Sequence, residues 1–441
     1  IMDNISPIDG RYHNITKSLS NYFSEFSFMK YRLYVELQYF VHLIDVLPEL
    51  KSIASPSIKS IIINIWKIFD KDDFNIIKQY EAILNHDIKA LEYFIRDKFK
   101  TIGLEKYTSF IHFGITSQDI NTSANILALK ESLFSCIIPN ISKIVSNINS
   151  FIQNLGSFST MLGFTHGQPA VPTTMSKEFH VFVYRINEQL KILNTMPFTT
   201  KFGGAVGNFN AHYAAYPEIN WTYFANNFIR NIGLQREQFT TQISNYDHLC
   251  NMLNVIKTIN NIINDLNIDC WLYISKGYLK LKSVPTEVGS STMPQKVNPI
   301  NFENSEGNIC IANAMLEGVT RKISISRLQR DLTDSTILRN LGSIMAYSLI
   351  AYTSTQKGIG KIEINHAIIK KELHENLSVL SEGIQTILRK HNVSDAYEKL
   401  HELTRDKRMN ITTLNIFIST LPQRVRIEVE QLTLDNYTGY T

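Results

Sequence analysis

Three polar segments of the sequence carry residue types that enzymes use for proton transfer and for binding anions. Residues 288–299 read VGSSTMPQKVNP and hold two adjacent serines, a lysine and an asparagine. Residues 165–169 place His166 just before a long helical pattern, and imidazole suits proton transfer near neutral pH. Residues 116–119 (TSQD) precede another helical pattern. Each segment alone is also typical of a surface loop, a solvated histidine or a helix N-cap, so only their combination suggests a site.

Short motifs of several other enzyme classes do not occur in the sequence. It contains no HExxH, no GxxxxGK[ST] and no GxSxG. The glycine-rich run at 203–207 does not follow a predicted strand, which favours a tight turn between helices over a dinucleotide-binding loop. No two of the 12 histidines stand at metal-ligand spacing on a predicted helix beside a carboxylate. We therefore expect neither a metal nor another cofactor.

The elements that must position these segments are predicted to be long helices. The chain has 441 residues with only 19 glycines and 12 prolines, well below the average share. Apolar residues recur at steps of three and four from Leu249 to Cys270, within a stretch free of glycine and proline, which predicts an amphipathic helix. Similar patterns occupy residues 120–155, with a kink expected at Pro139, residues 172–197 and residues 338–352.

These patterns predict an all-α protein of three helical domains. We expect an N-terminal helical domain at 1–111, a central domain of long bundled helices at 112–357, and a C-terminal helical domain at 358–441. Polar stretches that contain helix breakers separate the central helices, and loops on a rigid scaffold hold most catalytic groups. These stretches are residues 156–172, 197–217 and 282–301.

Composition excludes several classes of partner. The formal charge is +4 from 44 basic and 40 acidic residues, which gives little support to nucleic-acid binding. No apolar run reaches the length of a membrane span, and the first residues lack the pattern of a secretory leader. The four cysteines are scattered without CxxC spacing, which suits a reducing compartment. We expect a cytoplasmic protein that binds neither nucleic acid nor membranes.

Taken together, the three polar segments resemble the fumarase/aspartase superfamily of lyases, whose active-site loop follows GSSxMPxKxNP. Within it, the sequence is most similar to the adenylosuccinate lyase family, from about residue 6 to about residue 436. Two positions differ from the family pattern: Gln295 stands where histidine is common, and Phe164 where arginine is common. The family segments are 6–12 (SPIDGRY), 85–89 (NHDIK), 204–208 (GAVGN), 240–242 (TTQ) and 330–335 (RDLTDS).

This resemblance implies a β-elimination in purine nucleotide biosynthesis. Fumarate would leave adenylosuccinate to give AMP, and would leave succinylaminoimidazole carboxamide ribotide to give aminoimidazole carboxamide ribotide. Such a reaction needs a base for a carbon-bound proton, stabilisation of the resulting aci-carboxylate, and an acid for the departing nitrogen. The resemblance implies that Ser290 is the general base and His166 the general acid.

It also implies roles for the other candidate residues. Lys296 and Asn298 would stabilise the developing carboxylate charge, Glu303 would support the loop, and His86 would assist His166 or bind a carboxylate. Arginine suits the substrate phosphate because its planar fork donates several hydrogen bonds. The phosphate would bind Arg11, Tyr12, Arg330, Ser335 and Arg339, the succinyl carboxylates Thr116, Ser117, Thr165 and Gln242, and the remaining binding residues would be Asn85, Asp87, Asn304 and Thr336.

The resemblance further implies a homotetramer whose central helices form one bundle and whose active sites each draw loops from three chains. The apolar helices agree with this, since soluble monomers rarely expose large contiguous apolar patches. The expected partners are thus other copies of the chain and a phosphorylated succinyl-purine nucleotide.

Three alternatives stay open at this point. An argininosuccinate lyase or a fumarase would share the superfamily loop, but the phosphate-binding set of Arg11, Arg330 and Arg339 argues against both. A serine hydrolase or amidase would use Ser290 as a nucleophile with Lys296, and would form an acyl-enzyme that water must resolve. A non-catalytic helical scaffold would have no need of these side chains. Without the resemblance, Arg330 and Arg339 would be ordinary ion-paired arginines on a helix surface.

Overall fold

The computed structural model describes residues 3–156, 159–405 and 409–441 of the chain. Helices make up most of these residues, and the strands form three separate two-stranded sheets, so the expected all-α class is confirmed. The chain divides into two compact units, which are described separately below. Unit 1 contains residues 1–141, 189–261 and 307–351, and unit 2 contains residues 142–188, 262–306 and 352–441. The three helical domains expected from the sequence stay a prediction.

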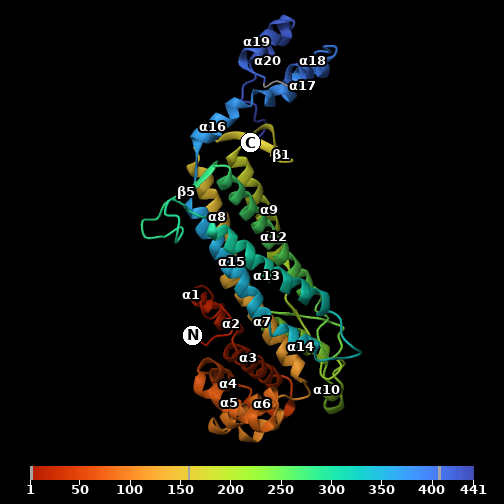
Figure 1. Ribbon diagram of the computed structural model, residues 1–441. Helices are drawn as coiled ribbons and strands as arrows, with labels where there is room; N and C mark the ends of the chain where they lie inside the picture. Colours follow the sequence, from red (N-terminus) through yellow and green to blue (C-terminus); the bar gives the residue numbers. More distant parts are fainter. Residues whose placement is uncertain (1–2, 157–158, 406–408) are drawn as a thin grey trace. The chain divides into compact units, whose positions relative to one another are not determined.

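Unit 1 contains most of the short helices (Figure 1). Asp70 caps one of them, α5, by accepting hydrogen bonds from the amides of residues 72 and 73, as N-cap side chains do. Helix α3 packs against α4 and α7, which places it at the centre of this part of the unit. The helices are α1 (His13–Thr16), α2 (Ser20–Phe23), α3 (Glu25–Ile44), α4 (Pro56–Lys67), α5 (Lys71–Leu84), α6 (Asp87–Thr101), α7 (Ser117–Ser132), α10 (Asn210–Ala215), α11 (Trp221–Asn231) and α14 (Thr333–Leu338).

Short helical turns and a small sheet connect the helices of unit 1. The 3₁₀ turns are Lys17–Leu19, Pro48–Ile53 and Glu105–Phe110, and the parallel strands are β3 (Thr199–Thr200) and β4 (Gln235–Arg236). A π-helical turn, Leu133–Ile137, joins α7 to α8 (Ile138–Asn154). This turn lies just before Pro139, which cannot donate a backbone hydrogen bond. The long helix expected over 120–155 therefore forms as α7 and α8 with the irregularity near the expected kink.

Besides α8, four longer helices contribute residues to both units. Three were predicted from apolar periodicity, and they form as α9 (Met175–Thr195), α12 (Asp247–Ser275) and α15 (Leu341–Lys361). The fourth, α13 (Ile300–Lys322), was not predicted. Two glycines, Gly307 and Gly318, interrupt its pattern, and a methyl group at either would meet open space. They therefore weaken the helical signal without being required by packing.

Buried polar contacts hold these long helices together within each unit. In unit 1, the amide of Asn260 on α12 donates to Asn313 on α13 at 3.1 Å. In unit 2, Asn267 on α12 donates to Ser305 on α13 at 2.9 Å and accepts from Thr355 on α15 at 2.8 Å. The hydroxyls of Ser305 and Thr355 lie 2.7 Å apart, so the three side chains close a triangle of hydrogen bonds. The side chains of Asn267, Ser305 and Thr355 therefore satisfy one another's hydrogen bonds.

An antiparallel hairpin in unit 2 replaces part of the loop expected at 156–172. Its strands are β1 (Thr160–Thr165) and β2 (Gln168–Thr174), and Thr165 pairs with Gln168 across a two-residue turn. Pro169 and Pro172 lie in β2, which is tolerated because each strand of a two-stranded sheet has a free edge. The second small sheet of unit 2 is antiparallel and joins β5 (Leu279–Leu281) to β6 (Ile362–Ile364).

The last helices of unit 2 pack around an apolar core of their own. Leu388 and Val425 are fully buried in it. The elements are α16 (His366–Glu375), the 3₁₀ turn Leu377–Leu380, α17 (Ser381–Lys390), α18 (Ala396–Thr404), α19 (Ile411–Ser419) and α20 (Gln423–Glu430). None of the helices in the described ranges combines the length and apolar character that a membrane span needs.

Candidate active site

A cavity of about 390 Å³ in unit 1 gathers side chains from four separate parts of the sequence. Its walls come from α2 and α3, from the corner before α6, from the first turns of α7, and from the segment around α14. Six of the residues predicted for the site line it: His86, Asp87, Ser117, Arg330, Ser335 and Arg339. Three guanidinium groups, from Arg32, Arg330 and Arg339, face this one space, so the cavity favours an anionic ligand.

The corner between α5 and α6 places His86 and Asp87 at the cavity. Asn85 ends α5 in the left-handed conformation, with φ of 52°, which asparagine adopts more readily than most residues. The side chain of His86 then caps α6, because its Nδ1 accepts a hydrogen bond from the amide of Lys89 at 3.1 Å. Asp87 Oδ2 lies 3.0 Å from Arg32 Nη2. The turn and the ion pair together fix both side chains.

Helix α7 presents its N-terminus to the same cavity. Thr116 is the N-cap residue, and its amide donates to Asp119 Oδ2 at 2.8 Å in a capping box. Ser117 and Gln118 of the first turn line the cavity. The first amides of a helix carry partial positive charge, so this end suits a carboxylate or a phosphate.

A fully buried ion pair ties the start of α7 to the glycine-rich turn at 203–207. Asp119 and Lys201 have no exposed side-chain surface, and Lys201 Nζ lies 2.8 Å from Asp119 Oδ1. The same oxygen accepts from the amide of Gly203 at 2.8 Å. Burial lowers the pKa of Lys201, although the Asp119 carboxylate opposes this shift. The run forms a turn as predicted, although the two-residue strand β3 does precede it.

The glycine-rich turn continues into a chain of hydrogen bonds that reaches the cavity. Gln242 donates to the carbonyl of Ala205 at 2.8 Å and accepts from Arg330 Nη1 at 2.9 Å. Arg330 Nη2 lies 3.5 Å from Ser335 Oγ, which also accepts from the Gln118 amide at 3.1 Å. Arg330 thus pairs with an amide and a hydroxyl and keeps its charge available for a ligand.

The other predicted residues of unit 1 lie outside the cavity lining. Arg11 and Thr336 are exposed, and Tyr12 is half-buried at the start of α1. Three others contact residues of the lining or position them: Asn85, Thr116 and Gln242. The structure therefore brings part of the predicted binding set into one space, and Arg11 and Tyr12 lie outside its lining.

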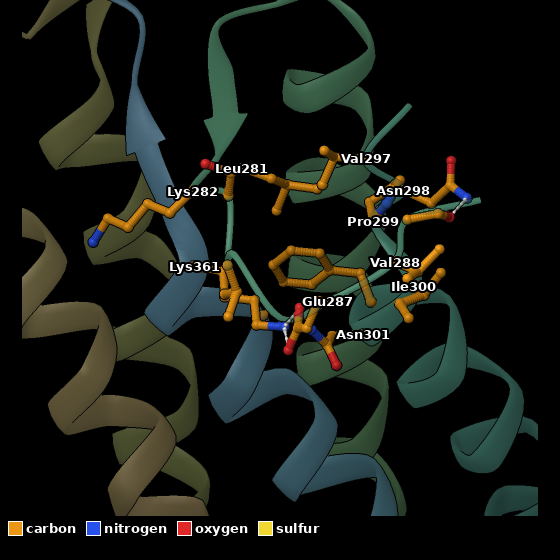
Figure 2. Close-up of a pocket in the computed structure, with 15 residues that line it drawn as sticks. Leu281, Lys282, Glu287, Val288, Val297, Asn298, Pro299, Ile300, Asn301 and Lys361 are labelled. Carbon is orange, nitrogen blue, oxygen red and sulfur yellow. Dashed lines mark hydrogen bonds and ion pairs between the residues drawn. The ribbon is translucent and has the colours of Figure 1, made fainter. Parts of the chain in front are cut away.

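The polar loop at 282–299 belongs to unit 2, where Figure 2 shows its two ends around a small apolar cavity. Lys361 on α15 pairs with Glu287 at 2.7 Å, and the Asn298 amide donates to the Gly289 carbonyl at 2.9 Å. A methyl group on Gly289 would lie 2.1 Å from the carbonyl oxygen of Lys296, so only glycine allows this close approach.

Ser290 lies within this loop, half-buried, and its hydroxyl oxygen has two amide donors. The amides of Thr292 and Met293 lie 3.3 and 3.1 Å from Ser290 Oγ. Amide donors favour the deprotonated form of a group that they contact. Lys296 is exposed on the same loop.

The remaining predicted residues of unit 2 lie on the hairpin and on α13. His166 and Thr165 are exposed at the hairpin tip, where His166 has φ of 53° and the next residue is glycine. Glu303 accepts a hydrogen bond from the Trp271 indole at 3.1 Å, and Asn304 accepts from the Ser354 hydroxyl at 2.6 Å. The hairpin and α13 thus hold these side chains on regular secondary structure.

The chain is similar in sequence to known lyases over nearly its whole length. A lyase family model matches residues 10–314, and a model described as the C-terminal region of adenylosuccinate lyase matches residues 326–438. An adenylosuccinate lyase of Legionella pneumophila is 44% identical over 99% of this chain and 96% of that protein. Those of Dictyostelium discoideum and Escherichia coli are 45% and 40% identical, with the same coverage. The chain belongs to the adenylosuccinate lyase family.

Solved structures of more distant proteins share the fold of this adenylosuccinate lyase family member. A fumarate lyase from Mesorhizobium sp. BNC1 aligns with a TM-score of 0.74 and 15% identity, covering 96% of this chain and 95% of that one. A 3-carboxy-cis,cis-muconate lactonizing enzyme from Pseudomonas putida aligns with a TM-score of 0.72 and 18% identity, covering 98% and 96%. At such low identity these similarities bear on the fold alone.

Sequence reasoning missed two buried charged residues of this family member, Arg32 in the cavity lining and Lys201 beside Asp119. Arg32 is almost fully buried, and its guanidinium lies 3.8 Å from the centre of the Phe28 ring. An arginine in the middle of a helix usually indicates a surface ion pair, so nothing in the sequence marked it. Lys201 was missed because a lysine in a polar stretch between helices is usually solvated, although its place beside the glycine-rich run was a usable signal. In the described ranges, no group of three or more metal-ligating side chains could hold a metal ion.

Proposed function

We propose that the chain is an adenylosuccinate lyase that releases fumarate from adenylosuccinate to give AMP. The observation that carries this proposal is the cavity in unit 1, where three arginines, His86 and the N-terminus of α7 converge on one anionic ligand site. Adenylosuccinate carries one phosphate and two succinyl carboxylates, so it matches this concentration of donors. The relatives that are 40–45% identical over the full length support the same substrate. We propose succinylaminoimidazole carboxamide ribotide as a second substrate.

We assign the phosphate to the side of the cavity formed by Arg330, Ser335 and Arg339. Arg330 is oriented by Gln242 at 2.9 Å and therefore presents its fork in one direction. The carboxylates then bind toward Ser117 and His86, where the helix terminus adds partial positive charge. Arg11, Tyr12, Thr165, Asn304 and Thr336 remain proposed binding residues.

For the chemical step we assign Ser290 as general base and His166 as general acid. Ser290 Oγ takes the proton from the carbon beside a carboxylate, the released electron pair forms the double bond of fumarate, and the carbon–nitrogen bond breaks. His166 gives its proton to the departing nitrogen. The two amides at Ser290 Oγ support the base role because they stabilise the alkoxide. Lys296 and Asn298 stabilise the aci-carboxylate, and Glu303 supports the loop.

We also propose a homotetramer with shared active sites, located in the cytoplasm. Support comes from large apolar side chains that the isolated chain exposes on its long helices. In unit 2 these are Val181 and Tyr184 on α9 and Ile268, Trp271 and Leu272 on α12. Light scattering at micromolar concentration should give the mass of four chains. A fully active monomer would contradict both the assembly and the shared sites.

The activity is tested by incubating the purified protein with adenylosuccinate, following its ultraviolet absorbance, and identifying AMP and fumarate as products. An argininosuccinate lyase or a fumarase would leave adenylosuccinate unchanged and turn over its own substrate. A hydrolase acting through Ser290 would form an acyl-enzyme detectable by mass spectrometry. Either result would replace the proposed function.

A further inference from the structure

The ring of His86 has one nitrogen already engaged by the backbone. The amide of Lys89 donates to Nδ1 at 3.1 Å, so Nδ1 must offer its lone pair and cannot carry a proton. A neutral imidazole has one protonated and one unprotonated nitrogen. The proton of His86 therefore lies on Nε2, and the side chain that lines the cavity offers an N–H donor to a ligand.

Arg32 binds the carboxylate of Asp87, the neighbouring group that could otherwise accept a proton from His86 Nδ1. Asp87 would be the natural counter-ion for an imidazolium, but its Oδ2 is paired with Arg32 at 3.0 Å and its Oδ1 accepts from the Ile88 amide at 2.8 Å. His86 Nδ1 stays 4.0 Å from Asp87 Oδ1, which is beyond hydrogen-bond distance. Burial alone would raise the pKa of Asp87, but Arg32 and the Ile88 amide outweigh it and lower that pKa.

Several positive groups lie around the part of the cavity that His86 lines. The positive end of α6 lies at its Nδ1, which accepts the hydrogen bond that caps the helix. Arg32, Arg330 and Arg339 line the same cavity, and Glu25 and Tyr22 complete its titratable lining. Lys89 turns its ammonium to Glu92 at 2.8 Å.

We propose that His86 acts as a neutral hydrogen-bond donor through Nε2–H, and that Arg32 is a positioning residue that keeps it in this tautomer by holding Asp87. The ligand atom is a carboxylate or phosphate oxygen of the substrate, an identity that rests on the proposed function. His86 then neither gives nor takes a proton during the reaction. Proton transfer to the departing nitrogen must come from another group, for which His166 is available.

Two substitutions at one position separate a donor from a proton-transfer group. In His86→Gln the side-chain amide nitrogen reaches the place of Nε2, whereas in His86→Asn the amide oxygen takes the place of Nδ1 and caps α6 well. We expect the glutamine variant to keep kcat/KM within about tenfold. The asparagine variant should stay folded but lose roughly 10- to 150-fold, the size of one lost hydrogen bond to a charged group. Equal losses in both variants, or a greater loss in glutamine, would overturn the proposal.

Arg32 is tested by its coupling to His86. If Arg32 acts through the tautomer, Arg32→Met should lower kcat/KM less in the His86→Gln background, because glutamine has no tautomers. Fully additive effects would reject the positioning role. Arg96→Met is the matched control, since Arg96 pairs with Glu92 at 2.9 Å outside the cavity lining and should leave turnover unchanged.

A measurement without substrate keeps this inference separate from the proposed function. Neutron diffraction from crystals of the deuterated protein at neutral pH should show deuterium on His86 Nε2 and none on Nδ1. In Arg32→Met, part of the deuterium should move to Nδ1 as Asp87 becomes free to accept it. Deuterium on Nδ1 in the unaltered protein would refute the proposal even if adenylosuccinate is turned over. Conversely, a failure to turn over adenylosuccinate would leave this result standing.

Discussion

Asparagine in place of Asp119 should destabilise the chain and lower its turnover, because this carboxylate joins three parts of unit 1. It pairs with Lys201 at 2.8 Å and accepts from the amides of Gly203 and Thr116, both at 2.8 Å. An asparagine removes the charge and turns one of the two acceptors into a donor. The buried ammonium of Lys201 would keep only the carbonyl of Gly204 at 2.6 Å. Removing one partner of a buried pair costs about 3–5 kcal/mol.

Thermal unfolding of the purified variants measures this cost. For 441 residues the unfolding entropy makes each kcal/mol worth about 1–2 °C in Tm, so Asp119→Asn should lower Tm by roughly 3–10 °C. Lys201→Met should cost less, because it removes the ammonium with its desolvation penalty and leaves Asp119 its amide donors. Lys78→Met, which breaks an exposed pair with Glu81, should change stability by less than about 1 kcal/mol. If Lys201→Met proved more damaging than Asp119→Asn, the reasoning would be wrong.

Four further predictions concern binding, catalysis, shared sites and pH. Arg330→Ala should weaken AMP binding in calorimetry by roughly 10- to 150-fold, because a charge-assisted contact is lost; unchanged affinity would remove Arg330 from the site. Ser290→Ala should still bind adenylosuccinate but turn over about 10² to 10⁴ times more slowly, while Ser291→Ala should lose far less. Tetramers mixed from the Ser290→Ala and His166→Ala variants should regain activity if sites are shared, and no recovery after verified subunit exchange would contradict this. Burial lowers the pKa of His212 to about 4. The unfolded chain therefore takes up a proton at this histidine at a higher pH than the folded chain does, so the free energy of unfolding should fall by up to ~3 kcal/mol as the pH drops from about 6.5 to 4. A His212→Gln variant with the same pH slope would exclude this group.

The long helices show what periodicity can and cannot reveal. Helix α12 was predicted because apolar residues recur along it without a breaker, and it forms as Asp247–Ser275. Helix α13 was not predicted because Gly307 and Gly318 interrupt its apolar pattern. The β1–β2 hairpin escaped because its prolines argue against a strand, yet an isolated pair of strands leaves room for them. Local sequence does not tell how many neighbours a strand will have.

The site shows a similar limit. Three of the four segments that line the cavity, 85–89, 116–119 and 330–335, were found from their motifs, whereas the segment from α2 to α3 was not. Arg32 was not found, because its burial depends on Asp87, which lies far along the chain. The burial of Lys201 likewise depends on its ion pair with Asp119, which is distant in the sequence. A single sequence gives no signal for pairs that fold together from distant segments, and this is where the prediction fell short.

The triangle of Asn267, Ser305 and Thr355 has a consequence for how far the long helices can slide. Apolar faces tolerate several axial offsets, because one aliphatic contact can replace another. A hydrogen-bonded triangle tolerates only one, since a shift of a single residue along α13 would strand three buried polar groups, at about 1–3 kcal/mol each. Ser305 lies on the second turn of α13, directly after the loop that carries Ser290. The triangle therefore fixes the axial position of α13, so the C-terminal end of the loop stays in place even when the rest of the loop moves.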